Sequence, residues 1–436
     1  MSQQSSRRDF LRNAAYAGVG MTLVDRALAS GYRTPNEKIN FACIGVGGKG
    51  HSDTLDASEF GNIVALCDVD ENTLNKMGAR FPEAKLFRDY RVMLDKMGKE
   101  IDAVTVSTPD HSHGPAAANA MLLGKHCFCQ KPLTHSIFEA HRLGEIATKM
   151  KVATQMGNQG TSGDGLRRGA AQLKAGIIGN VKELHIWTNR PIWPQGIPRN
   201  PTKTPPSNLD WDLWLGPAKE RPYADGYHTF AWRGWWDFGT GAQGDMGCHT
   251  VNMPFMGLEL RNAVSVQAEA GEDNHDSYPK WAIVTSEFAA TKNRPALTMY
   301  WYEGGKMPPK DLFGKVENPP DSGCLIVGDK GTIFNPSDYG QDARVVSGGV
   351  EIGEVQFPHS PGHMAEYARA IKGGEPAMSN FPGYAVPLTK TILLGNLAIW
   401  SPGKKIEWDS KRMHAKGAPE VEHIIRPTYR KGYSLG

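Results

Sequence analysis

Short apolar runs alternate with longer amphipathic stretches over residues 37–158, and this pattern predicts strands that alternate with helices. Residues 101–107 are apolar without a clean alternation, which is typical of a parallel strand buried on both faces. Repeated strand–helix units indicate an α/β fold with a doubly wound parallel sheet. The predicted strands are residues 38–44, 62–67, 101–107, 125–129 and 152–156, and the predicted helices begin near residue 50 and span 113–123 and 136–149.

A different pattern follows over residues 159–436, where we expect a second, α+β domain. Helices are predicted at 244–256, 363–372 and 386–400, and the last is apolar all round, which predicts burial. β-rich runs predict strands at 181–187, 263–269, 283–288 and 296–302.

A glycine-rich loop follows the first predicted strand. Gly45, Gly47 and Gly50 form G-x-G-x-x-G, in which small residues permit a tight turn and let the backbone approach a pyrophosphate. Gly48 and Lys49 complete the loop, and the helix that begins near Gly50 would point its amino-terminal amides at phosphate. The loop therefore predicts a dinucleotide site.

The second predicted strand ends at Asp68, 23 residues after Gly45, where such folds place an acid on the ribose hydroxyls. No arginine follows directly, because the next residues are Val69 and Asp70. A 2′-phosphate would face negative charge there, so the sequence favours NAD over NADP. The alternative is that Asp68 only closes a strand.

Two further features bear on chemistry. Lys131 follows a predicted strand, and Pro132 restricts it to an extended backbone, which places it at the ligand edge of the sheet. Asp245 and His249 are four residues apart on one predicted helix, where an acid can orient the ring and stabilise its protonated form. Taken singly, Lys131 could be a surface lysine and the other two an ordinary helix pair.

Together these motifs resemble the glucose-fructose oxidoreductase, inositol dehydrogenase and rhizopine-catabolism (Gfo/Idh/MocA) family. The resemblance covers nearly all of the chain after residue 29. It implies a Rossmann domain over 37–158 and a domain over 159–436 with an open, mainly antiparallel sheet that binds substrate and mediates homo-oligomer contacts, in a dimer or tetramer. The motifs that carry it are the Gly45–Gly50 loop, Thr108-Pro109 with His113, Lys131-Pro132, and Asp245 with His249.

The resemblance implies that Lys131, Asp245 and His249 form the active site for hydride transfer between a sugar or polyol carbon and the nicotinamide of NAD. Removing a hydride from an alcohol carbon also requires removing the hydroxyl proton. We expect His249 to be the base, oriented by Asp245, and Lys131 to stabilise the developing alkoxide. Residues expected beside the cofactor are Thr108, Pro109, His113, Gln130 and Lys131.

The chain departs from the family at Gln130, where the family has a glutamate. Losing that carboxylate makes a charged Lys131 less favourable. The sequence therefore leaves open whether Lys131 acts as a cation or as a proton donor.

Seven of the eleven tryptophans lie between residues 187 and 236, in a segment that is also rich in proline. Tryptophan faces suit the apolar face of a sugar ring, while arginines reach its hydroxyls. The candidate substrate-binding residues are Arg190, Trp193, Arg233 and Trp235, with Lys131, Asp245 and His249. The alternative is that the tryptophans fasten the segment to the domain, and both roles can hold for different residues.

Composition narrows the function classes. The 49 basic and 46 acidic side chains give a net charge of only +3, which argues against a nucleic-acid partner. The histidines and cysteines near residues 111–135 match no standard zinc spacing, so no metal site is predicted. The six cysteines are expected to be reduced core residues.

The first 29 residues resemble a twin-arginine export signal. Arg7 and Arg8 precede a weakly apolar run at 13–24 that is too short for a stable membrane anchor, and Ala27 and Ala29 fit a cleavage site. The alternative is a disordered basic tail. The resemblance implies the export machinery as a partner and a periplasmic location.

The periplasm holds no recycling pool of free NAD, so we expect a tightly retained cofactor. Three schemes then remain open: oxidation of one sugar with reduction of another, transfer of electrons to an external acceptor, or a redox-neutral cycle that cleaves a glycoside. An alternative of another class is a non-catalytic sugar sensor.

Overall fold

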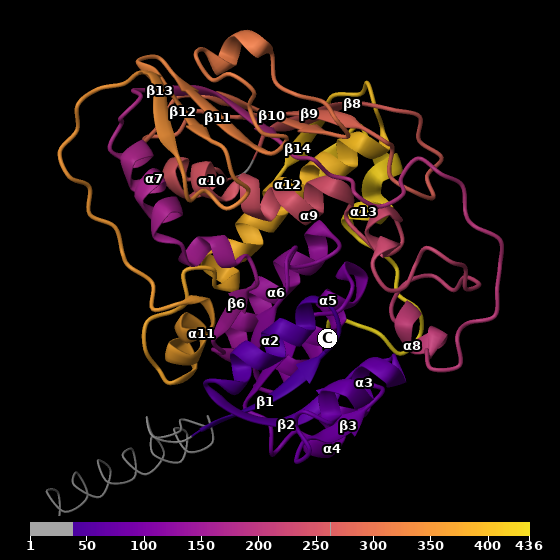
Figure 1. The fold of residues 1–436 in the computed structure, drawn as a ribbon. Helices are drawn as coiled ribbons and strands as arrows, with labels where there is room; N and C mark the ends of the chain where they lie inside the picture. Colours follow the sequence, from indigo (N-terminus) through magenta and orange to yellow (C-terminus); the bar gives the residue numbers. More distant parts are fainter. Residues whose placement is uncertain (1–37, 262) are drawn as a thin grey trace, which may run out of the picture.

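A six-stranded parallel sheet forms the lower layer of the computed structural model, which describes residues 38–261 and 263–436 (Figure 1). Its order is β3-β2-β1-β4-β5-β6, so the direction of winding reverses between β1 and β4. The predicted export signal at 1–29 lies outside the described residues. The strands are β1 (Ile39–Ile44), β2 (Gly61–Cys67), β3 (Lys85–Phe87), β4 (Ala103–Val106), β5 (His126–Cys129) and β6 (Thr154–Met156).

Both faces of this sheet are covered, as its apolar strands predict. In β1, Phe41 and Cys43 pack against one side, whereas Ala42 and Ile44 pack against the other. Ser136 and Glu139 form a capping box that fixes where α6 begins. The helices of this part are α2 (Lys49–Ser58), α3 (Glu71–Gly78), α4 (Tyr90–Met97), α5 (Asp110–Leu122) and α6 (Ile137–Met150).

A nine-stranded sheet forms the upper layer, in the order β13-β12-β11-β7-β10-β9-β8-β14-β15 (Figure 1). Neighbouring strands are antiparallel except β7 and β10, which run parallel. The predicted fold class is therefore confirmed. The strands are β7 (Val181–Trp187), β8 (Ser265–Ala270), β9 (Ala282–Phe288), β10 (Leu297–Glu303), β11 (Gly323–Gly328), β12 (Gly331–Asn335), β13 (Arg344–Gly348), β14 (Ile406–Asp409) and β15 (His414–Lys416).

Helices fill the space between the two sheets. The apolar helix α12 contacts α6, α9 and β8, and most of its residues are buried, as predicted. The predicted helix at 244–256 is instead two helices that meet at Val251; Pro254, in the first turn of the second, has no N–H to continue the first. The helices are α7 (Asp164–Lys174), α8 (Trp211–Leu215), α9 (Gly241–Thr250), α10 (Asn252–Leu258), α11 (His363–Ile371), α12 (Val386–Trp400) and α13 (Glu422–Ile425).

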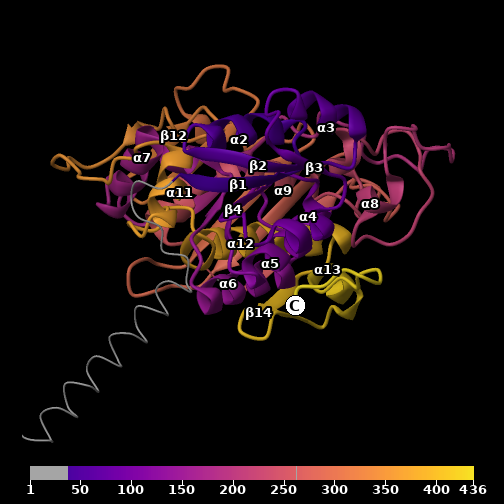
Figure 2. The same cartoon turned by 90° about the horizontal axis from the view of Figure 1, so that it is seen from below.

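The chain crosses back from the second part to the first. Helix α11 lies against the parallel sheet (Figure 2), where Tyr367 packs near Phe41 and Phe128 and its hydroxyl contacts the carbonyl of Val104 at 3.3 Å. The domain boundary at residue 158 therefore stays a prediction, since later residues also cover the first sheet. Across residues 38–261 and 263–436, no helix combines the length and apolar character that crossing a membrane requires.

Candidate active site

A cavity of about 650 Å³ opens at the carboxyl ends of the parallel strands, between the two sheets. It lies at the reversal between β1 and β4, where open α/β sheets bind ligands. Loops from the first part and α9 with the tryptophan-rich segment from the second part form its walls. The predicted site residues that line it are Gly45, Gly47, Gly48, Lys49, Asp68, Thr108, Pro109, Gln130, Lys131, Arg190, Trp193, Arg233, Asp245 and His249.

The glycine loop has the shape that a pyrophosphate needs. Gly45 has a φ of 77°, and a Cβ on Gly50 would lie 1.9 Å from the carbonyl oxygen of Gly45, so only glycine lets α2 approach β1 this closely. Gly48 precedes α2 with no side-chain cap, and a Cβ there would meet nothing within 4 Å. No side chain blocks this end of α2, so a phosphate can approach it, although the N–H groups of Gly50 and His51 already donate to the carbonyls of Gly47 and Gly48.

Asp68 ends β2 at the cavity wall. Its carboxylate accepts hydrogen bonds from the backbone N–H groups of Val46, at 2.9 Å, and Asp70, at 3.0 Å. Burial raises the pKa of Asp68, while these two hydrogen bonds oppose the rise. Asp68 therefore both fixes the glycine loop and presents a carboxylate where a ribose would bind.

Lys131 and Asp245 form the centre of the second cluster. The Nζ of Lys131 lies 2.7 Å from Oδ1 of Asp245 and 2.9 Å from its backbone oxygen. The Nε atoms of Arg233 and Arg190 lie 3.3 Å and 3.8 Å from the same carboxylate. Burial alone would raise the pKa of Asp245, but Lys131 and Arg233 outweigh it and bring the pKa to about 2. One carboxylate thus faces three cations.

His249 lies one turn along α9 and differs in detail from the prediction. Asp245 is bonded to Lys131 rather than to the histidine, and Nδ1 of His249 has no hydrogen-bond partner among the described residues. The ring packs edge-on against Tyr339, with centroids 4.8 Å apart. Burial, followed by the charge of Lys131, lowers the pKa of His249 to about 3, so the imidazole is neutral at pH 7.

Gln130 contacts Asp53, a residue that the sequence did not predict at the site. Its Nε2 donates to Oδ2 of Asp53 at 2.9 Å, and Asp53 also accepts from Lys49 and from Ser107, each at 2.7 Å. Asp53 is buried on α2, so a glutamate at position 130 would place a second carboxylate against it. The only sequence signal for Asp53 is its spacing of four residues from Lys49.

Three predicted site residues do not line the cavity: Gly50, which lies where α2 packs against β1, His113 and Trp235. The ring nitrogens of His113 contact the carbonyl oxygens of Thr108, at 2.8 Å, and Pro132, at 2.9 Å, so this side chain links the two loops. Trp235 is buried, and its indole N–H donates to the carbonyl of Gly226 at 2.9 Å. This hydrogen bond joins two parts of the tryptophan-rich segment. Packing turned both side chains away from the cavity.

Several residues that line the cavity were not predicted. Ile192 and Phe230 are 60% and 47% exposed, so they add apolar surface at its mouth. Arg88, Asp89 and Tyr433 line the same cavity as Asp68. These side chains come from separated parts of the chain, and no local motif identifies them.

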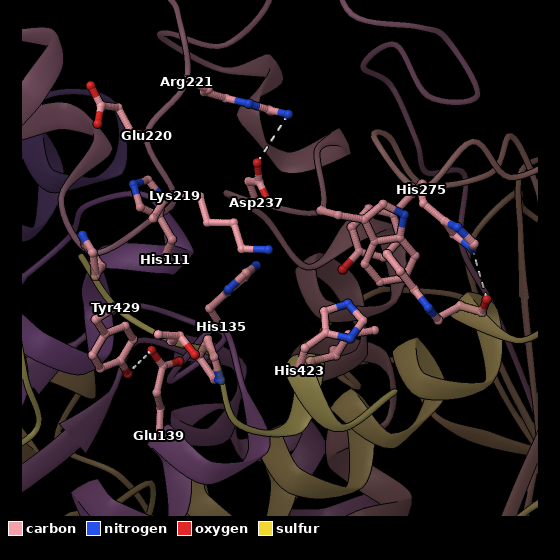
Figure 3. A pocket seen from close by; sticks show the side chains of 18 of the residues that line it. His111, His135, Glu139, Lys219, Glu220, Arg221, Asp237, His275, His423 and Tyr429 are labelled. Carbon is pink, nitrogen blue, oxygen red and sulfur yellow. Dashed lines mark hydrogen bonds and ion pairs between the residues drawn. The ribbon is translucent and has the colours of Figure 1, made fainter. Parts of the chain in front are cut away.

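A second cavity of about 440 Å³ is lined by His111, His135 and Glu139 among others (Figure 3). Two of its histidines bond backbone carbonyls: Nε2 of His111 lies 3.0 Å from the oxygen of Trp214, and Nε2 of His135 lies 2.9 Å from that of Gly239. The Nε2 atoms of both histidines therefore already have hydrogen-bond partners within the protein.

Two models of one oxidoreductase family match the chain. Residues 39–158 match the NAD-binding Rossmann fold of the Gfo/Idh/MocA oxidoreductases, and residues 181–293 match their C-terminal alpha/beta domain. The two matches fall on the two sheets described above.

Curated relatives match over shorter stretches. A glycosyl hydrolase family 109 protein of Solibacter usitatus is 31% identical over 156 residues, which are 32% of this chain and 36% of the relative. A myo-inositol 2-dehydrogenase of Thermotoga maritima is 25% identical over 153 residues, 35% of this chain and 45% of the relative. The chain thus spans less than half of either relative.

Solved structures share the fold at low identity. A WlbA dehydrogenase of Chromobacterium violaceum, in complex with NADH and UDP-GlcNAcA, superposes with a TM-score of 0.62 at 16% identity, over 86% of this chain and 97% of that one. An aldose-aldose oxidoreductase of Caulobacter crescentus, complexed with glycerol, gives 0.57 at 14% identity, over 85% and 100%.

Proposed function

Because the chain belongs to the Gfo/Idh/MocA family of oxidoreductases, with an NAD-binding Rossmann domain, we propose that it oxidises a hydroxyl group of a sugar, glycoside or polyol with NAD. One observation carries the proposal: Lys131, Asp245 and His249 line the same cavity as the glycine loop. Three side chains that suit alcohol oxidation, from distant parts of the sequence, thus share a cavity with the loop that would bind the cofactor. When bound there, the nicotinamide supplies the hydride acceptance.

The side chains of the chain itself handle the proton and the charge. Asp245 keeps Lys131 paired beside the cavity, where its ammonium group can stabilise an alkoxide on the substrate. The neutral imidazole of His249 can accept the hydroxyl proton, and the nearby charge of Asp245 favours the imidazolium that results. Burial of this cluster strengthens the attraction between its opposite charges, whereas it opposes the charged form of His249, whose pKa it lowers.

A glycoside fits the cavity mouth better than a bare polyol. The guanidinium of Arg233 lies over Trp232 at 4.3 Å and over Phe230 at 4.9 Å, and Phe230 packs edge-on against Trp193. Exposed Phe230 and Ile192 suit an apolar substituent, while Arg190 and Arg233 suit hydroxyl oxygens.

NAD fits the adenosine end better than NADP. Asp68 and Asp89 line that end, and a 2′-phosphate would meet both carboxylates. Nη2 of Arg88 at the same end already donates to the carbonyls of Val69, at 2.9 Å, and Asn208, at 3.2 Å, which leaves it fewer N–H groups for a phosphate. NADH in the related WlbA structure agrees with this choice.

A second candidate function is redox-neutral cleavage of a glycoside, in which transient oxidation at C3 acidifies the neighbouring C–H bond and permits elimination. The matches to glycosyl hydrolase family 109 proteins of Solibacter usitatus and Shewanella pealeana favour it. Both candidates need the same cofactor and the same three side chains.

We also propose export and assembly. The sequence at 1–29 supports export to the periplasm by the twin-arginine route, which in turn requires a retained cofactor. A homo-oligomer would use the outer face of the nine-stranded sheet, opposite α9 and α12, which the short helix η3 (Lys310–Phe313) covers in part (Figure 1).

The test is product analysis with a panel of sugars and glycosides. We expect the purified enzyme to carry NAD and to give products two mass units lighter, or free reducing sugar if it cleaves glycosides. Lys131→Met should lower turnover about 10²–10³-fold, because the alkoxide loses its cation. The matched control is Lys330→Met at an exposed position. Bound NAD with no product from any compound would instead indicate the sugar sensor.

A further inference from the structure

The last ten residues of the chain return to the parallel sheet. In Figure 1 the C-terminus lies beside α5, and Leu435 is buried in the core there. Before it, the hydroxyl of Tyr429 donates to Oε1 of Glu139 on α6 at 2.6 Å. The tail, residues 427–436, is thus fixed to the cofactor-binding part at both of its ends.

Within this tail, Tyr433 lines the large cavity. The guanidinium of Arg91 on α4 lies over its ring at 4.4 Å and also donates to the carbonyl of Gly432 at 3.2 Å. Asp89 caps α4 and binds Arg91 through both oxygens. The backbone N–H of Asp68 donates to the carbonyl of Phe87, so Asp68 lies beside the end of β3. Asp89 and Arg91 follow shortly after β3, and Tyr433 therefore closes the end of the cavity where the adenosine would lie.

Arg430 links the tail to a second segment over the same end. Its Nε donates to the carbonyl of Gly216 at 3.0 Å, Nη1 to Oδ1 of Asp212 at 2.7 Å, and Nη2 to the backbone oxygen of Asp212 at 2.8 Å. The neighbouring residues Leu213 and Trp214 line the cavity. One arginine side chain therefore holds α8 and the tail together.

We propose that the tail is a clasp over the adenosine half of the NAD site, with Tyr433 as a cofactor-contacting residue and Arg430 as the positioning residue that keeps the clasp shut. The inference rests on the proposed use of NAD and adds the device that retains it. NAD can leave only when the tail separates from α4 and α8. An aromatic ring also offers the adenine a stacking surface.

The test measures NADH release from the full-length protein. The protein is loaded with NADH, excess NAD is added, and the fall in NADH fluorescence gives the dissociation rate. Tyr433→Ala and Arg430→Met should each release NADH at least tenfold faster. Tyr433→Phe, which keeps the ring, and Lys431→Ala, an exposed position in the same tail, should stay within twofold of the wild type.

Dissociation rates of Tyr433→Ala and Arg430→Met within twofold of the wild type would overturn the clasp. Fast release from Tyr433→Ala alone would also overturn it, because the tyrosine would then act without the link to α8. Thermal unfolding of the NADH-free variants shows whether they fold. A wild-type protein that binds no NADH would instead refute the proposed function.

Discussion

Gln130 shows how one side chain sets the charge balance beside the cofactor site. Its amide donates to Asp53, which already neutralises Lys49 on α2. Lys131, the next residue, takes its counter-ion from α9 instead, through Asp245. The lysine charge is therefore compensated without the glutamate that the family has at position 130.

Restoring that glutamate should destabilise this protein. Gln130→Glu places two carboxylates against each other in a buried site, which raises the pKa of one of them. The free energy of unfolding should fall by about 1–3 kcal/mol at pH 8. The loss should shrink as the pH falls toward 5, because a carboxyl with a raised pKa takes up its proton in the folded state.

Urea unfolding at pH 8 and pH 5 measures this difference. Gln267→Glu, at an exposed position of β8, is the matched control and should be nearly neutral at both pH values. A Gln130→Glu variant as stable as the wild type at pH 8 would contradict the predicted repulsion between the two carboxylates.

At the scale of elements, the cofactor loop depends on how closely α2 approaches β1. The close contact of Gly50 with the carbonyl of Gly45 leaves no room for a side chain. The loop after β4 packs just as closely against Gly45, because a Cβ on Gly45 would lie 2.7 Å from the backbone oxygen of Ser107. Both restraints are steric and come from backbone atoms.

Gly50→Ala should therefore push α2 away from β1. We expect a loss of about 1–3 kcal/mol of stability and at least tenfold weaker NADH binding, because the amides of α2 move with the helix. Fluorescence titration and urea unfolding measure the two effects. Gly353→Ala, where a Cβ meets nothing within 4 Å, should change neither; unchanged NADH affinity in Gly50→Ala would contradict the role of the loop.

At the scale of the whole molecule, a buried ion pair joins the two parts. Arg167 on α7 pairs with Glu366 on α11, the helix that covers the parallel sheet, and both side chains are buried. Arg167 also donates to the carbonyls of Thr161 and Pro358. Burial raises the pKa of Glu366, but hydrogen bonds from Ser360, the N–H of Met378 and Arg167 outweigh it and lower the pKa.

Arg167→Met should cost about 3–5 kcal/mol at pH 7–8, because it leaves the carboxylate of Glu366 buried and unpaired. In the wild type, the lowered pKa of Glu366 gives stability that is present above its usual value of 4.5 and lost as the pH falls through the lowered value. The difference between wild type and variant should therefore narrow toward pH 4.

Urea unfolding across this pH range tests the prediction, with Arg168→Met as the exposed neighbour on the same helix. That control should lose less than about 1 kcal/mol. A constant difference between wild type and Arg167→Met from pH 8 to pH 4 would contradict the assignment to Glu366.

Much of the fold follows from short-range patterns in the sequence. Apolar runs predicted five of the six parallel strands and four of the nine strands in the second sheet, while β3, whose residues are exposed or half-buried, was not predicted. The glycine loop and the position of Lys131 before Pro132 are likewise set locally, by backbone geometry.

The sequence by itself determined the two-sheet class, the glycine loop and the spacing of Asp245 and His249. Only the tertiary structure decided that Asp245 meets Lys131, 114 residues away, and that Gln130 meets Asp53, 77 residues away. The tertiary structure also decided that Trp235 is buried within the tryptophan-rich segment and that Tyr433 lines the cavity. The physical reason is range: periodicity and backbone preference act within a few residues, whereas side-chain partners depend on how distant elements pack.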